Sequence, residues 1–140
     1  PPPFSSRRRH TRSGPQSRGL GDVYKRQVQG RGAQAAVEMI EEAAALEKAG
    51  ADILLLECVP KMLAAEITAN TEIPVIGIGA GNACDGQILV LHDLLGITPG
   101  KPPGFSKNFM QGSTDIQAAI MAYADDVRSR RFPANEHSFT

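Results

Sequence analysis

An apolar run that ends in a carboxylate constrains the fold more than any other feature of this chain. Residues 53–56 read Ile-Leu-Leu-Leu and lead directly into Glu57. Such a run predicts a fully buried strand of a parallel sheet. A carboxylate at the carboxyl end of a parallel strand is typical of α/β active sites, whereas an ion pair would also satisfy a buried strand end. The local pattern leaves both interpretations of Glu57 open.

The segments around this run alternate between helix and strand patterns. Residues 33–49 carry an apolar stripe at helical spacing, and Gly50 is suited to end a helix. Residues 61–71 carry a second helical pattern that Pro60 opens. Residues 73–82 repeat the apolar run and pass into a glycine-rich loop. The order helix, strand, helix, strand predicts parallel strands joined by crossover helices.

The remaining residues predict a short element, a long loop and a last helix. Residues 88–91 fit either a third short strand or a buried helical turn, and periodicity does not separate the two. Residues 97–109 are rich in Pro and Gly and predict a loop. The last helix is expected to begin after Ser113 or Thr114 through a capping box and to end before Pro133, with an irregular tail beyond it. Its buried stripe is expected to comprise Ile116, Ile120, Tyr123 and Val127.

A net charge of zero conceals two unlike regions. Residues 1–27 hold seven Lys or Arg side chains and one Asp, whereas residues 28–140 hold eight basic and fourteen acidic side chains. The first region is rich in Pro, Arg, Ser and Gly without apolar periodicity, so we expect it to be disordered. A basic arm for nucleic acid, a transit peptide and a non-native segment are the three interpretations.

Composition narrows the class of protein. A length of 140 residues allows one domain at most, and no apolar stretch is long enough to span a membrane. Cys58 and Cys84 lack the spacing of a metal site or a disulfide framework, and Cys58 is expected to be a small core residue. These features are compatible with a reducing cytoplasm.

Five motifs within residues 28–140, in this order, resemble the ketopantoate hydroxymethyltransferase family. They are VQGRG (28–32), LLLECVP (54–60), IPVIGIGAGN (73–82), DGQILVLHD (85–93) and EHSF (136–139). The resemblance implies an α/β fold of the (β/α)₈ TIM-barrel family, of which residues 28–140 would form the C-terminal part with the last three β/α units. Residues 1–27 resemble nothing in the family. This favours a non-native origin for them, because a transit peptide would precede a whole enzyme.

The resemblance also implies a reaction. Family members transfer a hydroxymethyl group from 5,10-methylenetetrahydrofolate to 3-methyl-2-oxobutanoate and so produce 2-dehydropantoate for pantothenate synthesis. The glutamate of the Leu-Glu-Cys-Val-Pro motif is the general base that removes the C3 proton, and it falls on Glu57 here. A magnesium ion would stabilise the enolate. The family's metal ligands lie in motifs that this chain does not contain, so no metal ligand is assigned and the chain alone is expected to be inactive.

The other polar residues of these motifs fit structural roles. Asp85 and His92 are left without an assigned function, although His92 is more typical of a core or interface histidine than of a ligand. Asp93 is expected to pair locally or to cap a turn. The glycine loop at 79–82 fits either an anion site or close packing at a barrel rim, and we favour packing.

Two alternative functions stay open from the sequence. One is an enolate-forming barrel lyase or mutase similar to isocitrate lyase, and the other is a non-catalytic fragment with a basic arm. The motifs at 57–60 and 136–139 favour the hydroxymethyltransferase. That family implies a small-molecule substrate, a folate co-substrate, a cytoplasmic location and a homo-oligomer, without nucleic acid or membrane as a partner.

Overall fold

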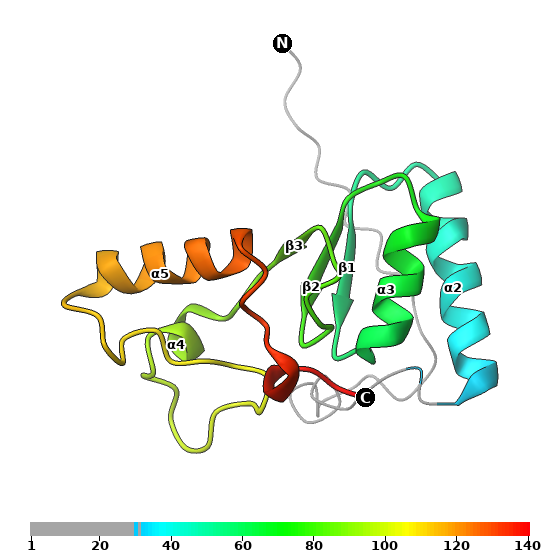
Figure 1. The fold of residues 1–140 in the computed structure, drawn as a ribbon. Coiled ribbons are helices and arrows are strands. Elements are labelled where there is room, and N and C mark those ends of the chain that lie inside the picture. Colours follow the sequence, from blue (N-terminus) through cyan, green and yellow to red (C-terminus); the bar gives the residue numbers. More distant parts are fainter. Residues whose placement is uncertain (1–29, 31) are drawn as a thin grey trace, which may run out of the picture.

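The computed structural model describes Gly30 and residues 32–140, so the predictions for residues 1–27 lie outside the described residues. Its main body is a three-stranded sheet with two helices packed side by side on one face (Figure 1). A long loop and a separate helix follow the third strand. The elements in chain order are α2 (Ala33–Lys48), β1 (Leu54–Glu57), α3 (Lys61–Asn70), β2 (Val75–Ile78), β3 (Gly86–Gln87), α4 (Leu91–Leu94), α5 (Ile116–Arg128) and the 3₁₀ helix η1 (Asn135–His137).

The strands are all parallel and lie in the order β1-β2-β3, which confirms the predicted arrangement. The main apolar core lies between the sheet and the helices α2 and α3. Leu54 and Leu56 point into it, whereas Leu55 is 55% exposed. The prediction that this strand is buried on both faces is therefore wrong for the described residues. Helices cover one face. On the other face Leu55 stays exposed, whereas Ile78 of β2 is buried together with Phe105 and packs against Leu89 and Phe139.

The third strand lies earlier than the sequence suggests. β3 consists of residues 86–87, and Ile88 adds one further backbone hydrogen bond to Gly77 of β2, at 3.0 Å. The helical turn α4 then begins only at Leu91. Both predictions for residues 88–91 were wrong in position, because the chain has left the sheet before the apolar run ends.

The last helix begins later than predicted. Asp115 is its N-cap, and its carboxylate accepts a hydrogen bond from the Ala118 backbone N–H at 2.8 Å. The predicted caps Ser113 and Thr114 do not serve this role, since the Thr114 hydroxyl donates to Asp115 instead. A carboxylate suits the helix N-terminus because it also interacts favourably with the helix dipole.

The predicted buried stripe of α5 is correct at Tyr123 and Val127, which pack against the second core, but wrong at the start of the helix. Ile116 and Ile120 are exposed, and Ala119 is the residue that is fully buried. The ring of Tyr123 packs edge-to-face against Phe109 at 5.4 Å between centroids and against Phe132 at 5.9 Å. This aromatic cluster fixes which side of α5 faces inward, and it forms a second core apart from the first.

The carboxylate of Asp126 holds the long loop and the end of α5 together. It accepts hydrogen bonds from Lys107 Nζ at 2.8 Å and from Arg131 Nε at 2.9 Å. The hydrogen bond from Lys107 is the main cause that lowers the pKa of Asp126 below its usual value. Partial burial opposes this shift, and Arg131 reinforces it. The folded protein therefore favours the ionised carboxylate.

We expect Asp126→Asn to reduce the free energy of unfolding by roughly 1–2 kcal/mol at neutral pH, a value discounted for the exposure of both cationic partners. Because the folded-state pKa is the lower one, the stabilisation is present above the ordinary carboxyl pKa of about 4. It disappears as the pH falls through the folded-state value. Denaturant titrations across this pH range should show that the free energy of unfolding falls less with decreasing pH in the variant than in the unmodified protein. Asp125→Asn is the matched control, since Asp125 pairs with Arg128 at 3.3 Å in an exposed position. Equal losses for both variants would contradict this role.

Candidate active site

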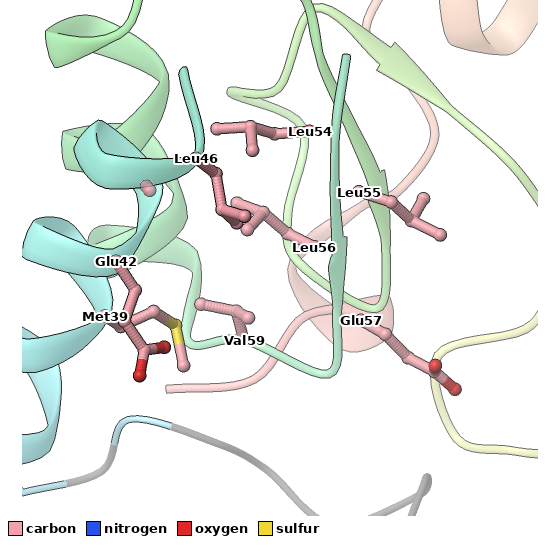
Figure 2. Close-up of a pocket in the computed structure, with 9 residues that line it drawn as sticks. Met39, Glu42, Leu46, Leu54, Leu55, Leu56, Glu57 and Val59 are labelled. Atoms are coloured by element: carbon pink, nitrogen blue, oxygen red, sulfur yellow. The ribbon is translucent and has the colours of Figure 1, made fainter. Parts of the chain in front are cut away.

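Glu57 is the last residue of β1 and lies in register with Ile78, the last residue of β2. The carboxyl ends of these two parallel strands therefore meet at one edge of the sheet. The side chains of Leu55 and Glu57 project away from α2, on the side opposite to Leu56 (Figure 2). The Glu57 carboxylate is exposed and forms no salt bridge within the part of the chain that the structure describes. Of its two interpretations, the structural ion pair is not formed among these residues.

Cys58 turns the chain immediately after Glu57. Its φ of 55° lies in the left-handed region, which is uncommon for a residue other than glycine. Its backbone N–H donates to the Ile78 carbonyl at 2.9 Å, and its side chain is completely buried. Burial raises the pKa of the Cys58 thiol, and the charge of Glu57 adds to the effect. The predicted role as a small core residue is confirmed, and the protonated thiol is not an activated nucleophile.

The glycine-rich loop after β2 is closely packed. Gly81 has a φ of 83°, and a Cβ atom there would lie 2.6 Å from the Cβ of Lys61. At Gly79 a Cβ would lie 3.0 Å from the ring of Phe105. Both positions require glycine because side chains from α3 and the long loop fill the space. The packing interpretation of residues 79–82 is therefore confirmed.

The C-terminal tail lies against the strand ends and the start of α3 (Figure 1). The Lys61 backbone N–H donates to the Phe139 carbonyl at 2.9 Å, and Lys61 Nζ donates to Asn135 Oδ1 at 2.9 Å. The ring of Phe139 packs edge-to-face on Phe105 at 6.1 Å. Sequence reasoning treated the tail as irregular and missed this contact, although the motif at 136–139 was a signal for it.

His137 stabilises the turn within that tail. Its Nδ1 atom accepts a hydrogen bond from the Ala134 N–H at 3.2 Å, so this nitrogen carries no proton. Burial lowers the pKa of His137, with Glu136 opposing the shift and Lys107 adding to it. The neutral imidazole is thus the form that fits the turn.

The other acidic candidates are occupied by local contacts away from Glu57. Asp85 accepts a hydrogen bond from the Val75 N–H at 2.9 Å and thereby fixes the start of β2. Asp93 is buried and accepts a hydrogen bond from the Thr98 hydroxyl, which confirms its predicted local pairing. His92 is exposed, so it is not a core residue, and the alternative of an interface histidine stays a prediction. The short helix α4 buries Asp93 and Leu94 instead.

Within Gly30 and residues 32–140, no three or more His, Cys, Asp or Glu side chains gather where they could share a metal ion. No helix in the same part of the chain is long and apolar enough to cross a membrane.

A comparison with protein families decides among the barrel enzymes. The model of the family described as ketopantoate hydroxymethyltransferase matches residues 10–135. The chain belongs to the ketopantoate hydroxymethyltransferase family. The match begins within residues 1–27, upstream of the boundary expected at Val28. That boundary and the non-native origin of the preceding residues stay predictions.

Individual relatives agree with the ketopantoate hydroxymethyltransferase family. A 3-methyl-2-oxobutanoate hydroxymethyltransferase of Alkalilimnicola ehrlichii is 62% identical over 112 residues, which cover 80% of this chain and 40% of that protein. A probable enzyme of the same name from Schizosaccharomyces pombe is 54% identical over 125 residues, which cover 89% of this chain and 46% of that protein. A third, from Pseudomonas fluorescens, is 56% identical over 127 residues, which cover 90% and 47%. The chain thus spans 40–47% of the length of these relatives.

Substitutions at Cys58 test whether backbone conformation shapes the site. We expect Cys58→Val to be less stable than Cys58→Ala by about 1–3 kcal/mol, because a β-branched side chain is strained at positive φ. At a buried position with ordinary backbone dihedrals, valine would stabilise the fold more than alanine because it buries more apolar surface. Cys58→Gly should remove the strain and leave only a small void.

The free energy of unfolding of the three variants, measured in denaturant, gives the ranking. Cys84→Ala is the control for loss of a buried thiol, since Cys84 is buried without a positive φ. If the Cys58→Val variant had the same free energy of unfolding as Cys58→Ala, the left-handed conformation would have no role in fixing the strand end.

Proposed function

We propose that this chain forms the C-terminal part of an enzyme that transfers a hydroxymethyl group from 5,10-methylenetetrahydrofolate to 3-methyl-2-oxobutanoate. The product is 2-dehydropantoate, an intermediate of pantothenate synthesis. Membership of the family and the names of the relatives support the reaction. The single observation that supports a role for this chain is the exposed carboxylate of Glu57 at the carboxyl end of a parallel strand.

Glu57 is proposed as the general base of this reaction. Its carboxylate takes the proton from C3 of the keto acid, and the electron pair of the broken C–H bond passes into the enolate. C3 then forms a bond to the one-carbon unit, whose two bonds to the folate nitrogens break. Water supplies the hydroxyl group, and the two nitrogens take up one proton from water and the one that Glu57 removed. The exposed position of Glu57 leaves its oxygens accessible to a substrate, as a base requires.

Several further properties are proposed from the family resemblance alone. They are dependence on Mg²⁺, a cytoplasmic location and assembly into a homo-oligomer without nucleic acid or membrane as a partner. A bound Mg²⁺ would act as a Lewis acid toward the developing enolate. No residue of this chain is assigned as a ligand for it, and its ligands are proposed to lie in the family motifs that this chain does not contain.

The test uses a whole enzyme in which this chain is joined to the upstream region of a relative. We expect Glu57→Gln to slow exchange of the C3 proton of 3-methyl-2-oxobutanoate with solvent deuterium by roughly 10²–10⁴-fold. The amide is nearly the same size as the carboxylate, so binding of the keto acid should persist. Proton exchange isolates the proposed step from the folate chemistry.

Glu66→Gln serves as the matched control, because Glu66 is an exposed residue of α3 and lies outside the strand end. The Glu66→Gln variant should exchange the C3 proton as fast as the enzyme without a substitution. Exchange at that same rate in Glu57→Gln would show that another group is the base. The 140-residue chain alone should show no turnover, and turnover by it would overturn the proposal that the upstream region is needed.

A further inference from the structure

A polar cavity of about 230 Å³ lies between the end of α4 and the long loop that follows it. Glu57 and the glycine-rich loop after β2 do not line this cavity, so it is separate from the candidate active site. Carboxylate, hydroxyl and amide groups supply its polar lining. They belong to Asp93, Thr98, Ser106, Asn108 and Gln111.

The carboxylate of Asp93 is buried beside this cavity. Among the described residues Asp93 is the only charged residue that is buried, with 6% of its surface exposed. Its Oδ1 atom accepts a hydrogen bond from the Thr98 hydroxyl. Its Oδ2 atom has no hydrogen-bond partner in this part of the chain, where every fully buried side-chain oxygen has one. Oδ2 is therefore accessible, and the space next to it is the cavity that Asp93 lines.

Internal hydrogen bonds decide which other groups can meet a ligand. The Thr98 hydroxyl donates its hydrogen to Asp93, and the Ser106 hydroxyl donates its own to the Pro103 carbonyl at 2.7 Å. Both hydroxyl oxygens are left as acceptors. Asn108 Oδ1 accepts from a backbone N–H at 2.9 Å, which leaves its NH₂ group as a donor. The cavity thus offers several acceptor oxygens around one carboxylate.

No cationic side chain offsets the charge of this carboxylate within the described residues. Asp93 forms no salt bridge there, and no Lys, Arg or His lines the cavity. Lys101 is close in sequence, but it is exposed and does not line the cavity. A buried carboxylate without a cationic partner costs free energy. A positively charged ligand offsets this cost, whereas an anion adds to it.

We propose that this cavity binds a small organic cation that carries a protonated primary amine. The ammonium group donates to Asp93 Oδ2 and to the hydroxyl oxygens of Thr98 and Ser106, and a hydroxyl group of the ligand accepts from the Asn108 amide. The cavity is smaller than the sites of about 300–1,000 Å³ that take drug-sized ligands. A calcium ion is a poorer occupant, because it takes about 6–8 oxygen ligands and a single carboxylate lines the cavity. The proposal does not depend on the proposed reaction.

The experiment titrates ethanolamine into the full 140-residue chain at constant ionic strength, and amide NMR spectra locate the binding. Ethanolamine carries both an ammonium and a hydroxyl group. Ethylene glycol is the matched neutral probe, because a second hydroxyl replaces the ammonium. We expect saturable shifts of the side-chain amides of Asn108 and Gln111 and of the backbone amides of Gly96 and Thr98. Ethanolamine should produce these shifts, and ethylene glycol at the same concentration should not.

Asp93→Asn removes the charge but keeps the size of the side chain and an acceptor for the Thr98 hydroxyl. Because hydrogen bonds to charged groups are the stronger ones, affinity for ethanolamine should fall by roughly 10- to 100-fold. Asp125→Asn is the matched control. It removes an exposed carboxylate that does not line the cavity, and the affinity should not change.

Gln111 allows a test that leaves the interior intact, since this residue lines the cavity but is exposed. Gln111→Glu should tighten ethanolamine binding and Gln111→Lys should weaken it, each by roughly two- to fivefold. The NMR spectrum of each variant shows whether it is folded. This pair decides the question if Asp93→Asn does not fold.

Four results would overturn the proposal. Equal shifts with ethylene glycol would make the cavity a site for neutral polyols. The same shifts on addition of KCl alone would make it a site for an alkali ion. Equal affinities of Gln111→Glu and Gln111→Lys would exclude a role for the ligand's charge, and the absence of saturable shifts would exclude binding. These readouts involve no turnover, so failure of the proposed reaction does not imitate failure to bind.

Discussion

The parallel register between β1 and β2 is the constraint on which the candidate site depends. It pairs Leu54 with Val75 and continues to Glu57 opposite Ile78. A shift by one residue would turn Glu57 toward the helices and move the leucines out of the core. The carboxylates of Glu47 and Asp85 hold this register from outside the ladder. Glu47 accepts hydrogen bonds from the two backbone N–H groups just before β2, at 2.7 and 3.1 Å, and Asp85 accepts the one from Val75.

The strand end is shaped by contacts that are distant in the sequence. The left-handed turn at Cys58 directs the chain from β1 toward α3. The Phe139 carbonyl then accepts a hydrogen bond from the first N–H of that helix. Helix N-termini leave such N–H groups without intrahelical partners, so the C-terminal tail satisfies one of them. The carboxylate of Glu57 thus projects from a strand end that is fixed from both sides.

Much of this arrangement could be predicted where periodicity and single-residue stereochemistry agree. The helices α2 and α3 were expected almost to the residue, because Gly50 and Pro60 mark boundaries that apolar spacing alone leaves vague. The position of Glu57 at the end of β1 followed from the run of leucines before it, whereas its exposure did not. The N-cap of α5 did not, since Ser113, Thr114 and Asp115 are all suitable caps and only tertiary packing selects one.

Other features left no reliable signal in the sequence. Cysteine has no preference for positive φ, so the turn at Cys58 is set by its neighbours in the fold. The contact between Lys61 and Asn135 spans 74 positions along the chain, far beyond any local pattern. The start of the α5 stripe was misplaced because aromatic rings contributed by Phe109 and Phe132 decide which side faces inward. Long-range packing overrode local hydrophobicity in each case.

The aromatic cluster around α5 has a consequence for how the molecule responds to stress. It forms a core of its own, and a hydrogen bond of 2.9 Å from the Tyr123 hydroxyl to the Gln87 carbonyl connects it to the sheet. Separate cores open as separate cooperative units. Thermal fluctuation or inherited substitutions can loosen the helix α5 while the paired strands keep their register. The tail that follows α5 still connects this core to the strand end, through the hydrogen bond between Lys61 and Phe139.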